Sequence, residues 1–396
     1  MKKLIALVLI ACLILCMFAG CTSSETPSTS DSQKPAETQD SQGTQDGEPD
    51  LSPKTIGVVI WGTDDATTTP IKALREYLAD SIGYSVIWKT GDFDGDAQLA
   101  AVENLINSGV DGVIMMPIVD LAIENYYQAC EDAGIPYIQF FRGIQDEELR
   151  NDMLSREYFL GWTNEDDVAA GYKMVEILAE NGCKNFAGIY MAPGNPATDD
   201  RQAGFEKAFA DGIGNKVAEY MLPFGNGTDP NLYTQATMNF FDQYGDGIDA
   251  IVSSVGSNGG SEAILAAIES AGKKCVAGEF DMPSTAAQTL EKGTLGCTAE
   301  GMMCDIVYVF AIMANYLMGT PLSAEPVCID TGYIFVTSAD EQAKYYQYVE
   351  SDGVYAYTAD EFKQMLKAYN PEFTAEDLQA LASAWSLQDV IDRHSN

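Results

Sequence analysis

The chain has 396 residues, of which 59 are acidic, 22 are basic and one is a histidine, His394. Nucleic acids and anionic lipid surfaces are bound by basic faces, so the net charge of −37 argues against both as partners. A single histidine near the C-terminal end also argues against histidine-based catalysis and histidine-rich metal sites, and no cofactor is expected. The length suits two lobes of ordinary domain size.

Residues 1–20 have the order of an export signal. Lys2 and Lys3 precede an apolar run over residues 4–18 that is too short to span a bilayer comfortably, and small residues follow it. We expect this segment to be removed from the mature protein. Residues 18–21 (FAGC) resemble a bacterial lipobox, which implies that Cys21 becomes the lipidated first residue; a plain secretory signal cut nearby is the alternative.

Residues 21–53 form the next segment, and after Cys21 they carry scarcely an apolar side chain. Such a composition cannot offset the entropy lost on ordering, so we expect a disordered tether. About thirty residues of this kind have a root-mean-square span of roughly 30 Å. The tether would keep a folded body close to a membrane.

Six cysteines remain once Cys12, Cys16 and Cys21 are set aside. An even number in an exported protein allows disulfides, but each lies in or beside an apolar segment and no CxxC motif occurs. This favours buried free thiols, since buried cysteine behaves as a small hydrophobe. The six are Cys130, Cys183, Cys275, Cys297, Cys304 and Cys328.

The body alternates between short apolar runs and segments of helical periodicity. This alternation predicts a mainly parallel α/β architecture. Strands are expected at residues 55–61, 84–89, 113–116, 136–141, 158–163, 184–190, 217–222, 248–253, 275–280 and 295–298. Helices are expected from about residue 70 to 82 and at 121–133, 164–179, 199–210, 231–244, 260–271 and 302–318.

Asp92, Asp94 and Asp96 are spaced like the first ligands of a calcium-binding loop. Ala97 occupies the position where such a loop needs glycine, and the apolar spacing that follows predicts a helix capped by Asp96. The helix is the favoured interpretation. A polar insert is expected at residues 145–156. Helices beyond residue 336 are expected at 339–349, 359–368 and 375–384, packed on the second lobe or over the cleft mouth.

Side chains that follow parallel strands face a crevice at the carboxyl edge of the sheet. Arg142, Arg201, Asp281 and Asp65 occupy strand-end or loop positions and could hydrogen-bond a polyhydroxylated ligand in pairs. Aromatic rings could cover its C–H faces, and the candidates are Trp61, Phe141, Trp162 and Phe224. The alternatives are core packing for the tryptophans and a turn or helix cap for Asp281.

Several short segments occur in an order that resembles a known family. They are residues 58–60 (VVI), 109–114 (GVDGVI), 133–136 (AGIP), 266–272 (AAIESAG) and 277–281 (AGEFD). Together with the lipoprotein signal they resemble the type 1 periplasmic sugar-binding proteins of ABC transporters, the ribose- and galactose-binding group, over about residues 54–336. The resemblance implies two Rossmann-like lobes with parallel sheets, joined by three crossing hinge strands. The first lobe would be residues 54–160 plus 301–327, and the second 161–300 plus 328–396 with extra C-terminal helices.

The resemblance also implies positions for the ligand site. Phe141 stands where the family has an aspartate that grips sugar hydroxyls, and threonines at 67 and 68 stand where it has stacking aromatics. The late aspartate falls on Asp281, and the hinge glutamine falls near Glu300 or Gly301. The full set of expected ligand-binding residues is Trp61, Asp64, Asp65, Thr67, Phe141, Arg142, Trp162, Asn164, Arg201, Phe224, Ser257, Asn258, Asp281 and Glu300.

The function that follows is that of an extracytoplasmic solute-binding lipoprotein, anchored to the bacterial cell membrane. It would capture a small polar ligand between its lobes, with a sugar as the favoured class, and deliver it to the permease of an ABC importer as a monomer. The alternative is the same fold used as a sensor for a membrane kinase or chemoreceptor. An exported glycosidase is disfavoured because the carboxylates scatter and no G-x-S-x-G motif occurs. Arg201→Ala is expected to abolish ligand-dependent stabilisation and leave the fold intact.

Overall fold

The first sheet contains six parallel strands in the order β11-β5-β4-β3-β1-β2. The structure is a computed structural model that describes residues 48–62, 68–91, 94–117, 123–223, 229–256, 259–351 and 354–395; the expected signal segment, Cys21 and most of the tether lie outside them. The strands are β1 Thr55–Ile60, β2 Ser85–Thr90, β3 Gly112–Met115, β4 Tyr137–Gln139, β5 Phe159–Glu165 and β11 Val327–Thr331.

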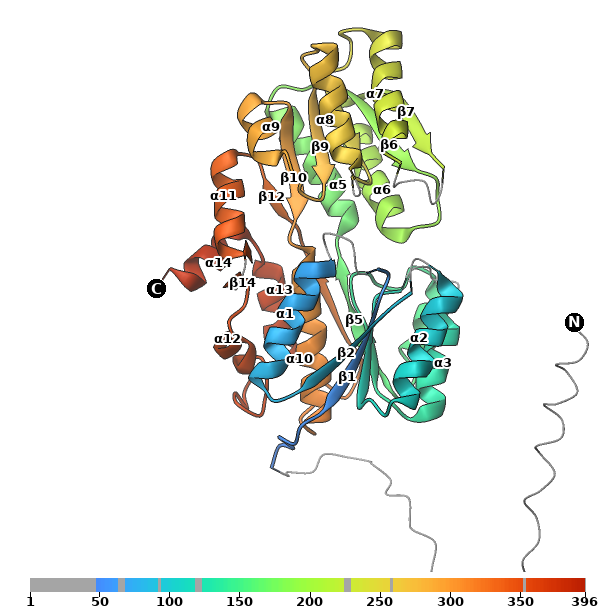
Figure 1. Ribbon diagram of the computed structural model, residues 1–396, viewed down its shortest axis with the longest axis vertical. Coiled ribbons are helices and arrows are strands. Elements are labelled where there is room, and N and C mark those ends of the chain that lie inside the picture. The colour runs from blue at the N-terminus through green and yellow to red at the C-terminus, as the bar shows by residue number, and fades with distance from the viewer. Residues whose placement is uncertain are drawn as a thin grey trace, which may run out of the picture. The chain divides into compact units, whose positions relative to one another are not determined.

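Helices cover both faces of this sheet (Figure 1). Alternate residues of each strand point to opposite faces, so Val58 packs with α1 (Thr68–Ser81) and α10 (Asp305–Leu317), whereas Val59 packs with α2 (Gly95–Asn107) and α3 (Ile123–Ala133). Burial on both faces is why the central strands β1 and β3 are almost entirely apolar.

The second sheet has the order β12-β10-β9-β8-β6-β7, and only β12 among these strands runs antiparallel to its neighbour. Its strands are β6 Asn185–Met191, β7 Asn215–Leu222, β8 Ala250–Ser253, β9 Val276–Phe280, β10 Leu295–Glu300 and β12 Ile334–Val336. Its helices are α5 Asp167–Glu180, α6 Pro196–Ala210, α7 Pro230–Tyr244, α8 Gly260–Ala271 and α9 Ala286–Lys292.

Three segments of the chain connect the two sheets. The first leads from β5 into α5, the second from β10 through η2 (Met302–Cys304) into α10, and the third from β11 to β12. Residues 47–396 belong to one compact unit. The prediction of two α/β lobes joined by three crossing segments is confirmed.

Two of the crossing strands lie in the first sheet, although we had assigned residues 161–300 and 328–396 to the second lobe. Residues 161–165 of β5 pair there with the whole of β11, in a register that sets Gly161 opposite Val327. Gly161 has φ of 115°, and a Cβ at this position would overlap the Val327 carbonyl. Strand patterns do not reveal which sheet a crossing strand joins, because that depends on pairing between distant residues.

Local details also differ from the sequence expectations. The polar insert contains a helix, α4 (Glu147–Met153), which Asp146 caps. Helix α2 is capped by Asp94 in place of Asp96, because the Asp94 side chain accepts a hydrogen bond of 2.8 Å from the Ala97 N–H. Five of the six body cysteines are buried, while Cys328 is exposed, and the described residues contain no disulfide. None of the described helices is long and apolar enough to cross a membrane.

The C-terminal segment, residues 337–395, contacts both lobes (Figure 1). Helix α11 (Ala339–Tyr348) packs on α9 of the second lobe; α12 (Ala359–Gln364) packs on α1, and α13 (Ala375–Ala384) on β11, both of the first. The final helix, α14 (Leu387–His394), packs on α11, and a hairpin of β13 (Glu350–Ser351) and β14 (Val354–Tyr355) precedes α12. Thr358 and Thr374 cap α12 and α13, which begin where the sequence predicts helices. The segment therefore bridges the two lobes. The sequence led us to expect it on the second lobe or over the cleft mouth, and neither expectation included its contacts with the first lobe.

Helix α12 continues an aromatic stack that begins at a buried cation. The Arg75 guanidinium carbon lies 3.5 Å from the centroid of the Phe310 ring, and Phe310 stacks on Phe362 at 4.9 Å. Arg75 is fully buried, none of its guanidinium nitrogens has a hydrogen-bond partner among the residues that the structure describes, and burial lowers its pKa to about 9. A buried donor without a partner is a net cost to stability, and more so when it is charged.

We therefore expect Arg75→Met to raise the free energy of unfolding by about 1–3 kcal/mol, because methionine fills similar space without the unsatisfied charge. Urea-induced unfolding followed by tryptophan fluorescence measures it. Phe310→Ala is the control and should destabilise by about 3–5 kcal/mol. If Arg75→Met destabilises by a similar amount, the guanidinium makes a favourable contact and the prediction is wrong.

Candidate ligand-binding site

Eight of the predicted site residues lie in the described part of the chain. Asp64, Asp65, Thr67, Phe224, Ser257 and Asn258 lie outside the described residues. The other eight occupy the carboxyl ends of strands or the segments that cross between the sheets, apart from Arg201 on α6. They fall into three groups, which follow β4, line the first crossing segment, and surround the ends of β9 and β10.

Phe141 and Trp61 form an aromatic pair beyond the strand ends. Their ring centroids are 4.7 Å apart at an interplanar angle of 87°. Phe141 has φ of 79°, which is costly for a residue with a large side chain, and its N–H donates to Asp305 Oδ2 over 3.1 Å. Asp305 is the first residue of α10. The start of α10 thus holds the backbone that orients Phe141, and a strained backbone at such a position favours a functional role.

Arg142 is buried and fixed to the ends of β3 and β4. Its Nη2 donates to the Pro117 carbonyl, and its own carbonyl accepts from Gln139 Nε2 over 2.6 Å. Gln139 in turn accepts from the Tyr127 hydroxyl over 2.8 Å. The groups named here all belong to the first lobe, and the sequence did not identify them.

Trp162 and Asn164 lie two residues apart on β5, and both side chains are close to Gly143. Trp162 packs in the core between the first sheet and helices α2 and α3, with its ring 6.2 Å from that of Phe159, so core packing describes it. Asn164 accepts from the Gly143 N–H over 2.8 Å and donates to Asp330 Oδ1 over 3.2 Å. Asn164 connects the loop after β4 to the third crossing segment.

Arg201 is the centre of the best-connected polar cluster. It is buried, and its Nε donates to Asp167 Oδ1 over 2.7 Å, while Nη2 donates to the Tyr333 hydroxyl over 2.9 Å. Its guanidinium carbon lies 4.1 Å from the centroid of the Phe280 ring. The Tyr333 hydroxyl also contacts Glu165 Oε2 at 2.5 Å. The cluster joins two crossing segments to a helix of the second lobe.

Tyr333 also lines a pocket of about 770 Å³. Its lining combines the first turns of α5 with the end of β11 and the start of β12, and includes Lys173 and Lys207. Both lysines are ion-paired, with Glu176 and Asp211 respectively. Tyr333 therefore belongs both to the lining of this pocket and to the buried Arg201 cluster.

Burial dominates the electrostatics of this cluster. It raises the pKa of Glu165 and of Asp167, and for Glu165 the nearby carboxylates of Asp305 and Asp167 raise it further. Burial alone would lower the pKa of Arg201, but Tyr333 and Asp167 outweigh it and the guanidinium pKa rises. The arginine is permanently charged, and the surrounding acids compete for a proton.

Asp281 and Glu300 close the group at the ends of β9 and β10. Asp281 has φ of 63° and its N–H donates to the Ala299 carbonyl over 3.4 Å. The Glu300 carboxylate accepts from the Thr298 hydroxyl over 2.5 Å, and burial raises its pKa, with a further contribution from Asp281. The charge of Asp281 also acts on Arg201, so these predicted residues share one electrostatic environment.

Asp305→Asn should flatten the pH dependence of stability. Burial raises the pKa of Asp305 from 3.8 to about 8, an effect that the Phe141 N–H reduces and the charge of Asp167 increases. The folded protein therefore keeps a proton that the unfolded chain releases. The contribution of Asp305 to the free energy of unfolding is then greatest in acid and falls as the pH rises between about 4 and 8. For one proton the slope is at most about 1.4 kcal/mol per pH unit.

Chemical denaturation at several pH values measures this slope. Asparagine retains an acceptor for the Phe141 N–H and does not titrate. Glu291→Gln, at an exposed carboxylate on α9, serves as the control. An unchanged slope in Asp305→Asn would show that this carboxyl does not carry the linked proton.

Four residues of the cluster were not predicted: Glu165, Asp167, Asp305 and Tyr333. Glu165 and Asp167 lay at the start of the helix expected at 164–179, and Asp305 lay near the start of the helix expected at 302–318, so each had an ordinary local explanation. Tyr333 follows Glu165 by 168 positions, and no local pattern relates the two. The signal that could have identified these residues is a polar side chain at a position expected to be buried next to a crossing strand.

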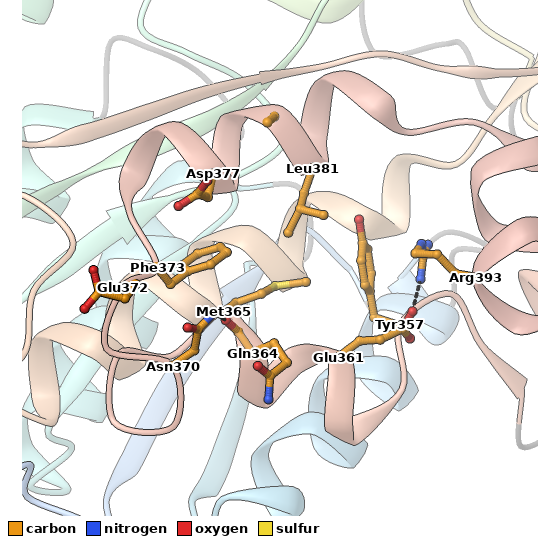
Figure 2. A pocket seen from close by; sticks show the side chains of 11 residues that line it. Tyr357, Glu361, Gln364, Met365, Asn370, Glu372, Phe373, Asp377, Leu381 and Arg393 are labelled. Carbon is orange, nitrogen blue, oxygen red and sulfur yellow. Dashed lines mark hydrogen bonds and ion pairs between the residues drawn. The ribbon is translucent and has the colours of Figure 1, made fainter.

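Figure 2 shows a second pocket, of about 590 Å³, inside the C-terminal segment. Met365, Phe373 and Leu381 give it apolar walls, and the Arg393–Glu361 ion pair of 2.7 Å lies at one end. Its lining contains none of the predicted site residues.

Two α/β lobes that share three crossing segments, with arginines, carboxylates and aromatic rings gathered where those segments meet the strand ends, define a two-lobed binding protein. A family model described as a periplasmic binding protein domain matches residues 56–319. The match covers more than half of the chain, which therefore belongs to this family.

Characterised relatives are distant and match part of their length. The chain is 24% identical over 159 residues to a xylitol-binding protein of Mycolicibacterium smegmatis, covering 40% of this chain and 42% of that protein. It is 24% identical over 87 residues to the D-xylose-binding periplasmic protein of Escherichia coli, covering 22% and 24%. The matches thus span less than half the length of these relatives.

Solved structures agree with the fold over a larger share. A periplasmic ribose ABC transporter protein from Conexibacter woesei aligns with a TM-score of 0.64 at 16% identity, covering 76% of this chain and 97% of that one. A galactofuranose-binding protein aligns with a TM-score of 0.62 at 17% identity, covering 76% and 100%. At these identities the similarity establishes the fold.

Proposed function

We propose that the protein is an extracytoplasmic solute-binding protein that captures a sugar or polyol and delivers it to an ABC importer. The observation that carries the proposal is the presence of two buried arginines, Arg142 and Arg201, at the ends of parallel strands or beside a crossing segment in a strongly acidic chain. Relatives described as binding xylitol and D-xylose support the ligand class. A lipid on Cys21 would hold the protein, as a monomer, at the cell membrane.

Capture would use both lobes. Arg142 belongs to the first lobe, while Arg201 and Asp281 belong to the second, so a ligand between them gains its full set of contacts only when the lobes close around it. Planar guanidinium groups hydrogen-bond adjacent hydroxyls in pairs, and the Trp61–Phe141 pair offers an apolar surface to ligand C–H groups. The closed form would be the one that the permease recognises.

Thermal unfolding of residues 47–396 against pentoses, hexoses, polyols, nucleosides and amino acids tests the proposal. A compound present at about a hundred times its dissociation constant adds roughly 2.7 kcal/mol of stability and raises Tm. A shift with a sugar or polyol supports the proposal, whereas a shift confined to amino acids would contradict the ligand class. Co-purification with a permease would separate import from a sensory output.

A further inference from the structure

The Tyr333 hydroxyl has three close polar neighbours. Glu165 Oε2 lies at 2.5 Å, Asp167 Oδ1 at 2.7 Å and Arg201 Nη2 at 2.9 Å. These groups come from β5, α5 and α6, and Tyr333 itself lies in the third crossing segment. Few hydroxyls can satisfy three such contacts, so the positions of the hydrogens are constrained.

A phenol has one hydrogen to donate and two lone pairs to accept with, and a guanidinium can only donate. Arg201 therefore donates to the Tyr333 oxygen. Asp167 Oδ1 also accepts from Arg201 Nε over 2.7 Å, and this ion pair favours its charged form, so Tyr333 donates its hydrogen to Asp167. The 2.5 Å contact with Glu165 is then a hydrogen bond only if Glu165 carries a proton and donates it to Tyr333.

The surroundings of Glu165 agree with this assignment. Glu165 is buried, and burial together with Asp305 and Asp167 raises its pKa, while Tyr333 and Arg201 act in the opposite direction. The elements packed around Glu165 bring further charged groups into its surroundings. The titratable and charged groups that act on it or on its neighbours are Arg142 after β4, Asp167 on α5, Arg201 on α6, Cys304 and Asp305 at the start of α10, Asp330 on β11, Tyr333, and Arg393 on α14.

We propose that Glu165 and Tyr333 are positioning residues for Arg201, and that Glu165 performs this role as a carboxylic acid that donates a hydrogen bond to the Tyr333 oxygen. The inference rests on the proposed function insofar as Arg201 contacts the captured ligand. If Glu165 ionises, two carboxylates, Glu165 and Asp167, face a hydroxyl that has only one hydrogen to donate. The hydrogen bond that Glu165 donates to the Tyr333 oxygen is then lost, and Tyr333 is held less firmly beside Arg201. Ligand capture would then weaken as the pH rises through the pKa of Glu165.

The first test needs no ligand. Infrared spectra near neutral pH should contain carbonyl bands of protonated carboxylic acids, to which Asp305 and Glu300 also contribute. The difference spectrum between the wild type and Glu165→Gln should show the loss of one such band, that of Glu165. Glu176→Gln is the matched control, because Glu176 is a half-buried carboxylate on α5 that pairs with Lys173 at 2.5 Å. Identical spectra for the wild type and Glu165→Gln would overturn the assignment of the proton.

The positioning role is tested by NMR of the Arg201 side chain. Glutamine can still donate to Tyr333 through its amide, whereas leucine cannot. The ¹⁵N signal of the Arg201 Nε–H should therefore stay slow to exchange with solvent in Glu165→Gln, and should shift and exchange faster in Glu165→Leu and in Tyr333→Phe. Equal perturbation in the glutamine and leucine variants would overturn the role of a donated hydrogen bond.

Titration with xylitol and with D-xylose links the cluster to capture. We expect the Kd of the wild type to rise by up to about tenfold per pH unit above the pKa of Glu165, and the Kd of Glu165→Gln to change less. The same pH dependence in both proteins would overturn the inference. If neither compound binds, the proposed ligand class fails, and the infrared and NMR results still decide the inference.

Discussion

Arg201→Ala is expected to lower the free energy of unfolding by about 3–5 kcal/mol. The substitution removes the cation that pairs with Asp167 and leaves that carboxylate buried without its main partner, since Asp167 is only 3% exposed. Denaturant-induced unfolding measures the loss. From the sequence we expected this variant to keep the fold intact, because Arg201 was placed facing an open cleft; its pairing inside the cluster predicts a large structural cost as well as a loss of ligand binding.

A double variant separates charge from packing. Replacing Arg201 by methionine and Asp167 by leucine removes both charges together, and buried ion pairs replaced by apolar residues of similar volume are often no less stable than the original. The double variant should therefore be clearly more stable than Arg201→Ala. If the two are equally destabilised, the cost comes from lost packing against Phe280 and not from an uncompensated charge.

Trp385→Ala is expected to destabilise the protein by about 3–5 kcal/mol, because it removes a buried aromatic side chain at the junction of the C-terminal segment with a crossing segment. The ring is 5% exposed and stacks on Tyr357 with centroids 6.2 Å apart. A Cβ on Gly301, which has φ of 97°, would lie 2.8 Å from the Trp385 indole nitrogen. The indole therefore packs directly against the second crossing segment.

The control for this prediction is Tyr369→Ala, an aromatic residue of the same segment that is 41% exposed and should cost well under 1 kcal/mol. Thermal and urea unfolding of both variants provide the comparison. A loss in Trp385→Ala no larger than that of the control would show that the C-terminal segment folds without being coupled to the body.

The strands and helices of the body could be predicted from the sequence because their signal is local. The apolar run that forms β1 and the periodicity of α3 each depend on neighbours within a few residues. The order of these elements was enough to predict two α/β lobes, and Arg142 could be placed at a strand end from its position alone. The cap of α2 was misplaced by two residues, and the missed helix α4 is short.

Only the tertiary structure decided what these side chains contact. The pairing of β5 with β11 joins residues more than 160 positions apart. The same long-range arrangement brings Glu165 and Asp167 to the hydroxyl of Tyr333. A sequence pattern reports whether a position is buried, because burial repeats with the period of the helix or strand. Which charged groups meet in that buried space depends on how distant elements pack, and the cost of burying a charge is set by those partners.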